Sequence, residues 1–155
     1  MILRRAQELL DERHPYQFDA RIMETHRAPE RQWQLFRKGR RLVKGKWHRV
    51  GRTVTNARPH QSAHCVTMED GTPAAMAADF WVVCKVPITW RGKHAQAGHI
   101  LPDGHAAWAC IPAAAWIAGG EQVRIGAAFG TIQDWPHVEL ADWRKRAPRG
   151  IVRTS

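Results

Sequence analysis

The sequence has no stretch of about 18 or more consecutive apolar residues, so it offers no candidate for a membrane-spanning helix. The N-terminal segment, residues 1–10, is too polar for the apolar core of a signal peptide, and we expect none. Its apolar positions 2, 3, 6, 9 and 10 recur instead at helical spacing, which predicts a first helix over residues 2–12. If such a protein acts outside the cytoplasm, another factor must release it.

Cysteine is scarce. Cys65, Cys84 and Cys110 are the only three, and no two of them are spaced as C-x-x-C. An odd number without this spacing is not typical of a disulfide framework or a zinc finger. We therefore predict buried, reduced thiols. The motif H-E-x-x-H is also absent, which excludes the common helical zinc site of metalloproteases.

Acidic residues are few: 14 Asp and Glu stand against 24 Lys and Arg, and the formal net charge is +10. The cations concentrate in residues 37–52 and in a C-terminal tail from about residue 142, which holds Arg144 through Arg153. A positive surface attracts anions of any kind. Nucleic acid, teichoic acid, lipopolysaccharide and anionic lipid are candidate partners, and a solvated basic face without a dedicated partner is the alternative.

The rest of the chain mixes helical and strand signals without a regular alternation of the two. A second helix is predicted over residues 29–38, since Pro29 suits a first helical turn and Gly39 suits a helix end. Pro112 should kink or split any helix over residues 104–120. The other expected elements are a loop over 56–64, a buried strand over 78–84 and a short strand over 137–140. We predict an α+β fold with a small antiparallel sheet flanked by helices, in a single domain of all 155 residues.

Histidine and aspartate residues occur in three short segments that could supply a catalytic zinc site. These are residues 62–64, 77–80 and 134–139, and each is weak by itself because short motifs often match by chance. A catalytic zinc ion needs three protein ligands and an open position for water, whose pKa it lowers to about 7. A nearby carboxylate takes the proton of the water and passes it to the leaving amine. The order of these segments, together with residues 24–32, makes them informative.

Residues 24–32 read E-T-H-R-A-P-E-R-Q, residues 56–64 read N-A-R-P-H-Q-S-A-H, and residues 134–139 read D-W-P-H-V-E. This series resembles the LAS-type metallopeptidases, the superfamily of D-alanyl-D-alanine peptidases, phage L-alanyl-D-glutamate endopeptidases and the hedgehog signalling domain. Their pattern is E-T-x-R-[ST]-x-x-R-Q, then N-A-x-P-x-x-S-x-H-x-x-G-x-A-x-D, then D-x-P-H-x-E. The matching segments follow the family's order, and the resemblance implies the family's fold with one zinc ion, Zn²⁺.

The resemblance implies a role for each matching residue. The zinc ligands are His64, Asp79 and His137, and the catalytic carboxylate is Asp134, three residues before the last ligand. Arg27 matches the arginine that binds substrate and stabilises the oxyanion, where negative charge grows in the transition state.

Three further residues have less defined roles. Gln32 and Ser62 match positions near the substrate or behind the residues that contact it. Glu139 lies two residues after His137, on the same face of the predicted strand. Two roles are open for it, since it could orient a metal ligand or pair with an arginine.

One spacing departs from the family pattern. The pattern separates its first histidine and its aspartate by seven positions, whereas His64 and Asp79 are fifteen apart (79 − 64). An insertion of eight residues between Cys65 and Ala74 accounts for the difference. Asp70 is a rival ligand, but it lies in a Glu-Asp-Gly-Thr-Pro sequence that predicts an exposed turn. We favour Asp79 because a buried strand follows it, and we expect the insertion to reshape the rim of the site.

The resemblance implies hydrolysis of an amide bond in the stem peptide of peptidoglycan, and its phage members favour the L-alanyl–D-glutamate bond. We expect a monomeric endolysin that waits in the host cytoplasm and then acts on the cell wall, with basic segments that could engage anionic envelope polymers or lipids. A D-Ala-D-Ala carboxypeptidase or dipeptidase is one alternative. A non-catalytic binding domain of the same fold is another, and a basic nucleic-acid binder is a third. We expect no specific nucleic acid partner, because basic runs leave the His and Asp residues unexplained.

Overall fold

The computed structural model describes residues 1–68, 70–102, 104–128 and 136–146. Contacts between residues divide the chain into two compact units, and each is described by itself. The first unit consists of Met1–Thr25 and Ala77–Asp142, and the second of His26–Met76 and Trp143–Ser155. The expectation of a single domain stays a prediction.

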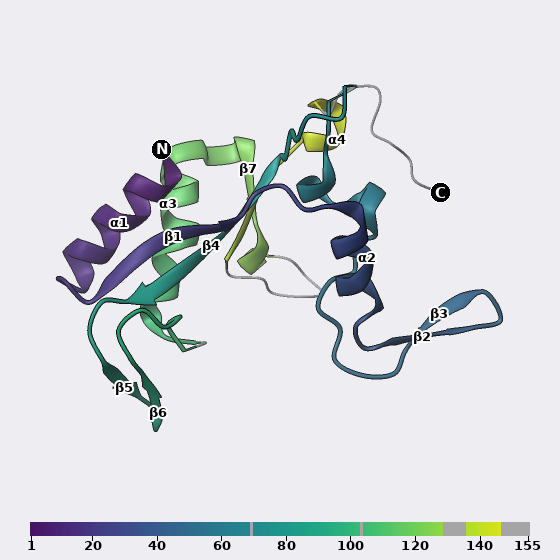
Figure 1. The fold of residues 1–155 in the computed structure, drawn as a ribbon. Coiled ribbons are helices and arrows are strands. Elements are labelled where there is room, and N and C mark those ends of the chain that lie inside the picture. Colours follow the sequence, from purple (N-terminus) through teal and green to yellow (C-terminus); the bar gives the residue numbers. More distant parts are fainter. Residues whose placement is uncertain (69, 103, 129–135, 147–155) are drawn as a thin grey trace. The chain divides into compact units, whose positions relative to one another are not determined.

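The first unit contains a four-stranded antiparallel sheet with the strand order β1-β4-β8-β7 (Figure 1). The strands are β1 (Phe18–Glu24), β4 (Ala77–Cys84), β7 (Val123–Ile125) and β8 (His137–Leu140). β4 is rich in aromatic and β-branched residues, which favour strands, and it lies inside the sheet between β1 and β8. A separate hairpin joins β5 (Ile88–Trp90) to β6 (Lys93–Ala95). The α+β class with a small antiparallel sheet is confirmed.

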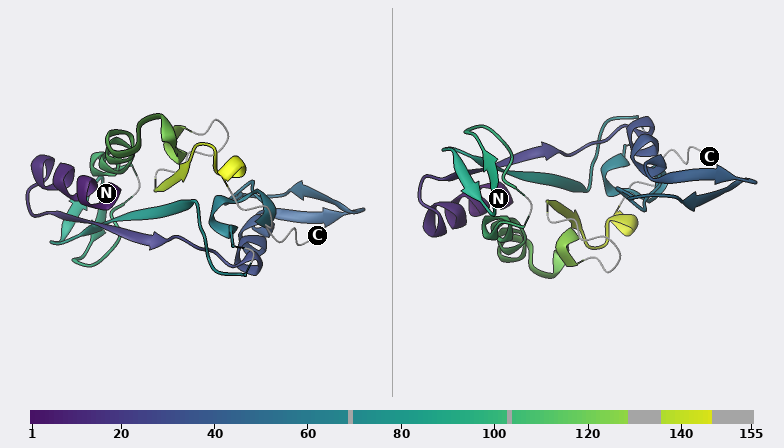
Figure 2. Two further views of the ribbon diagram at one scale, coloured as in Figure 1. Left: turned by 90° about the horizontal axis from the view of Figure 1, so that it is seen from above. Right: turned by 90° about the horizontal axis from the view of Figure 1, so that it is seen from below.

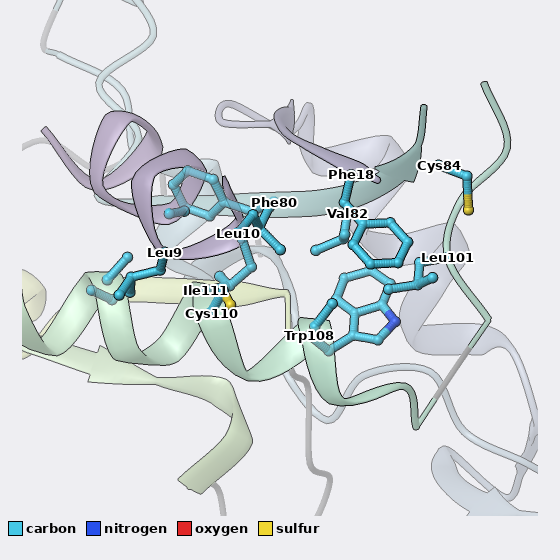
Figure 3. Close-up of a cluster of buried hydrophobic side chains, with 14 of the residues drawn as sticks. Leu9, Leu10, Phe18, Phe80, Val82, Cys84, Leu101, Trp108, Cys110 and Ile111 are labelled. Carbon is cyan, nitrogen blue, oxygen red and sulfur yellow. The ribbon is translucent and has the colours of Figure 1, made fainter. Parts of the chain in front are cut away.

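Two helices cover this sheet and lie side by side: α1 (Ile2–Arg13) and α3 (Cys110–Gly119). Their apolar side chains and those of β4 form the core, with Leu9, Leu10, Phe80, Val82 and Ile111 among its buried members (Figure 3). Burial of this apolar surface is the main stabilising contribution. Short 3₁₀ turns connect the elements: η3 (Ala106–Ala109), η4 (Gly120–Gln122) and η5 (Gly126–Ala128).

The predicted helical stretch over residues 104–120 is divided into η3 and α3, and the division lies before Pro112 rather than at it. Pro112 is the third residue of α3, which starts at Cys110. In the first turn of a helix, a backbone N–H has no partner within the helix, so its absence in proline is tolerated. The chain before α3 forms the 3₁₀ turn η3, and the irregularity therefore lies ahead of Pro112.

The second unit is built around α2 (Pro29–Arg37), whose predicted start at Pro29 is confirmed. The hairpin of β2 (Arg40–Val43) and β3 (Lys46–Arg49) follows it, and Figure 2 shows this two-stranded ribbon standing out from α2. Gly39 between them has φ +70°, and a Cβ atom there would lie 2.3 Å from the carbonyl oxygen of Arg52. Only glycine fits this close approach. The remaining elements are η1 (Pro59–Gln61), η2 (Ala63–Cys65) and α4 (Trp143–Arg146).

Two predictions about composition can be checked in the described residues. Cys65, Cys84 and Cys110 are buried thiols outside any disulfide, as expected, and burial raises the pKa of the Cys84 and Cys110 thiols. Within the described part of the chain, none of the helices combines the length and hydropathy needed to cross a bilayer.

The core of the first unit gives a stability prediction. Ile111 is fully buried in α3, whereas Ile117 in the same helix is 55% exposed. Ile111→Ala should lower the free energy of unfolding by about 2–5 kcal/mol, because it leaves a cavity among packed neighbours. Ile117→Ala, the matched control, should change it by less than about 0.5 kcal/mol. Urea denaturation followed by circular dichroism measures both. Equal effects of the two substitutions would contradict the position of the core.

Candidate metal centre

Asp79 and His137 face each other across two neighbouring strands. β4 and β8 are antiparallel, and their register places Asp79 directly opposite His137. Side chains of directly opposed residues lie on the same face of a sheet. Asp79 Oδ1 is 2.9 Å from His137 Nδ1, although the two residues are 58 positions apart in the sequence. The structure thus brings together two of the three residues that the sequence motifs suggested as ligands.

Glu139 contacts the other nitrogen of the same imidazole ring. Its Oε2 is 3.3 Å from His137 Nε2, and its Oε1 is 3.0 Å from Nη1 of Arg124. Arg124 lies directly opposite Glu139 in the β7–β8 register. Both roles left open for Glu139 therefore occur together, since one carboxylate oxygen contacts the histidine and the other pairs with an arginine.

The two carboxylates change the titration of the ring between them. Burial lowers the pKa of His137, because a charged ring loses water contacts. Hydrogen bonds and the negative charges of Asp79 and Glu139 act in the opposite direction and outweigh burial. Together they raise the pKa of His137 from 6.5 to about 9. Without a metal ion, the ring is therefore a cation between two acids at neutral pH.

These residues fit a divalent metal ion such as zinc by the chemistry of their donor atoms. Two donors bound to one tetrahedral zinc ion, each about 2.0–2.1 Å from it, are roughly 3.3 Å apart. The 2.9 Å separation of the Asp79 and His137 donor atoms is close to this value. A carboxylate on the second ring nitrogen, here Glu139, is the usual partner of a metal-binding histidine. A metal ion would replace the proton at Nδ1.

His64 belongs to the second unit, where it is buried within η2. Its carbonyl oxygen accepts a hydrogen bond of 2.9 Å from the backbone N–H of Arg27. Ser62, also buried, is the residue between η1 and η2. The backbone bond therefore holds two of the predicted site segments, those of Arg27 and His64, next to each other.

Gln32 connects Arg27 to the loop that follows the β2–β3 hairpin. It lies in α2, is completely buried, and accepts a 2.7 Å hydrogen bond from Nη1 of Arg27 with its Oε1. Its Nε2 donates a 2.7 Å bond to the carbonyl oxygen of Ala57. A guanidinium with this partner has fewer accessible orientations, and both polar ends of the buried amide are satisfied.

The insertion between His64 and Asp79 is a closed loop. The backbone N–H of Ala74 donates to the carbonyl oxygen of Val66 at 2.9 Å, and Thr67 and Pro73 form a β-bridge. The chain thus leaves at residue 66 and returns at residue 74. Asp70 is exposed on this loop and accepts a 2.8 Å bond from the N–H of Thr72. Its carboxylate caps the turn, which agrees with the turn predicted there.

For two residues, the sequence motifs and the described structure cannot be matched. Asp134, the predicted catalytic carboxylate, lies outside the described residues. Arg124 was not a candidate from the sequence, because only the pairing of β7 with β8 places it beside Glu139. A basic residue in a short strand carries no signal of this kind in the sequence.

Comparison with known proteins gives a structural likeness. No family model matches the chain. No curated protein matches it. The crystal structure of Serratia marcescens L-Ala D-Glu endopeptidase ChiX is similar, with 20% sequence identity, a TM-score of 0.49, and coverage of 93% of this chain and 80% of that chain. These values are too low to support conclusions about chemistry, which depend here on the residues themselves.

The electrostatics of His137 give a pH prediction for the metal-free protein. The folded-state pKa of about 9 lies above the ordinary 6.5, so the stabilisation is complete below about pH 6.5 and is lost as pH rises to about 9. Glu139→Gln should lower the pKa of His137 and reduce this loss, whereas Glu121→Gln, at an exposed position, should change neither. NMR titration of the imidazole with chelator present measures the pKa. A His137 pKa near 6.5 in the wild type would refute the prediction.

Proposed function

We propose that this protein is a zinc-dependent peptidase that hydrolyses the stem peptide of peptidoglycan, at the L-alanyl–D-glutamate bond. The observation that carries the proposal is the pairing of Asp79 with His137. The sequence motifs named both as metal ligands, and they are side by side on β4 and β8 with donor atoms 2.9 Å apart. If the two motifs matched only by chance, there would be no reason for Asp79 and His137 to lie side by side.

We propose His64 as the third ligand. In this proposal the metal ion would be held by two imidazoles and one carboxylate, those of His64, His137 and Asp79. Three protein ligands with one open position are typical of catalytic zinc sites rather than structural ones. When bound, zinc supplies a water molecule that is acidic enough to act as a nucleophile near pH 7.

The protein side chains supply the proton transfers and the oxyanion contact in this proposal. Water attacks the carbonyl carbon of the scissile amide while the carboxylate of Asp134 takes its proton. Asp134 then donates that proton to the leaving nitrogen as the C–N bond breaks. The guanidinium of Arg27 stabilises the negative oxygen of the tetrahedral intermediate. Gln32 restricts the orientation of Arg27 through the 2.7 Å bond, which favours this contact.

The biological setting is part of the proposal. The phage-type motifs suggest an endolysin that remains in the host cytoplasm until the membrane is permeabilised. It would then act on the cell wall as a monomer. Its stem-peptide substrate is anionic, which suits the formal net charge of +10.

Digestion of purified muropeptides tests the activity. Wild-type protein with added zinc should release L-alanine-terminated and D-glutamate-terminated fragments, and chelation should stop the release. Asp134→Asn should lower the rate by about 10²–10⁴-fold, the usual contribution of a general base. Asp11→Asn, a matched change on the exposed face of α1, should leave the rate unchanged. Release of single D-alanine would favour a carboxypeptidase, and cleavage that survives chelation would refute metal dependence.

The closed insertion loop allows a test of the aspartate ligand. Deletion of residues 67–74 joins Val66 to Ala75, at a place where the chain already returns on itself. The His64–Asp79 separation then falls from fifteen to seven (15 − 8), the spacing of the family pattern. We expect the deletion variant to keep its zinc affinity in calorimetric titration, because Asp70 is removed but Asp79 remains.

The matched substitutions are Asp79→Asn and Asp70→Asn in the full chain. Asp79→Asn should weaken zinc binding strongly, and Asp70→Asn should not. Circular dichroism confirms that each variant is folded. The opposite ranking would make Asp70 the ligand, and loss of zinc binding in a folded deletion variant would support the same conclusion.

A further inference from the structure

A basic hairpin, residues 37–52, extends from the end of α2 and consists mainly of exposed residues. It contains eight Lys and Arg residues and no Asp or Glu. Every residue from 41 to 46 and from 48 to 52 is exposed. Lys44 and Gly45 form its two-residue turn, both with positive φ (47° and 75°), which matches the twist of a tight β-hairpin.

The base of the basic hairpin is held firmly within its own unit. The Arg40 guanidinium donates to the carbonyl oxygen of Thr55 at 2.8 Å and to Oδ1 of Asn56 at 2.6 Å. Trp47 packs edge-to-face on Phe36, with ring centroids 5.9 Å apart, and the Arg37 guanidinium lies 5.9 Å from the Trp47 ring centroid. The hairpin is thus a preformed ribbon.

The outer part of the basic hairpin combines cations with exposed aliphatic side chains. The strand register places Arg41 opposite His48 and Val43 opposite Lys46, so these four residues share one face, with Lys44 at the turn beside them. Leu42 is 53% exposed, Val43 43% and Val50 63%. Within the described residues, Arg41, Lys44 and Lys46 form no ion pair.

We propose that the basic hairpin binds the surface of an anionic lipid bilayer. Lysine and arginine beside a membrane are attracted by its negative surface potential. Aliphatic side chains among them gain by leaving water for the boundary between headgroups and acyl chains. A ribbon with three cations around its turn and exposed Leu42, Val43 and Val50 meets both conditions. The proposal does not depend on the peptidase chemistry.

A nucleic acid explains these features less well. Binding to single strands relies on aromatic faces on which bases stack. Trp47 is half-buried and already packs on Phe36, and the Arg37 guanidinium lies near its ring. The exposed apolar groups are aliphatic, and the phosphate oxygens that take up most protein–DNA hydrogen bonds give them no apolar contact. Lipid satisfies both the charge and the apolar character of the hairpin.

Vesicle co-sedimentation of the full-length protein tests the proposal. Wild type should bind vesicles of equal parts phosphatidylglycerol and phosphatidylcholine, and should not bind pure phosphatidylcholine. Replacing the cations with Arg41→Gln, Lys44→Gln and Lys46→Gln should weaken binding on the order of a hundredfold, since each cation near such a surface contributes about fivefold. The separate double variant Leu42→Ser/Val43→Ser should also bind anionic vesicles more weakly than the wild type. Its residual binding should be more sensitive to salt, because it depends on charge alone.

The matched control removes the same charge elsewhere, with Arg4→Gln, Arg21→Gln and Arg91→Gln at exposed positions. It should bind anionic vesicles far better than the hairpin variant. Equal losses in the two triple variants would overturn the proposal, because net charge alone would then explain binding. Tighter binding to duplex DNA than to vesicles, lost in the hairpin variant but kept in Leu42→Ser/Val43→Ser, would assign the surface to nucleic acid and also overturn it.

Discussion

The arrangement of the candidate metal centre depends on the register of β4 and β8. One residue of slippage would move every side chain of a strand to the opposite face of the sheet, and Asp79 would no longer meet His137. The register is secured on the inner side by packing, since Phe80, Val82 and Val138 belong to the same core as the helices α1 and α3. The hydrophobic core and the polar pair are thus two consequences of one alignment.

Because the pair of Asp79 and His137 is largely buried, its polar atoms need hydrogen-bond partners within the protein. The side chain of His137 is only 11% exposed and needs partners for both of its ring nitrogens, because unpaired polar groups are costly away from water. Asp79 and Glu139 provide these partners, and Arg124 balances part of their charge. Without metal the ring holds a proton, and with metal it would exchange that proton for the ion. The same carboxylates that favour the proton therefore also favour a divalent cation.

In the second unit, a buried cation, Arg27, likewise has a hydrogen-bond partner. Arg27 is largely buried, and Gln32 contacts its guanidinium while bonding to the backbone at Ala57. The basic hairpin differs between its base and its turn. At the base, the guanidinium of Arg40 is fixed by hydrogen bonds, whereas the cations around the turn are exposed to solvent.

Local pattern determined much of the fold. Helical spacing of apolar residues predicted α1, Pro29 predicted the start of α2, and the aromatic and β-branched run predicted β4. The order of the motifs along the chain also singled out Asp79 and His137 as candidate ligands. The break expected near Pro112 lies at Cys110 instead, because proline is tolerated in the first turn of a helix and the sequence does not show where that turn begins.

Tertiary structure alone decided the rest. β1, β7 and the hairpin strands carry weak local signals and exist because neighbouring strands complete their hydrogen bonds. The two contacts of Glu139, the place of Arg124 beside it, and the closed loop that carries Asp70 all depend on pairings between distant segments. A sequence records which groups are available, whereas distances between groups on different strands follow only from register.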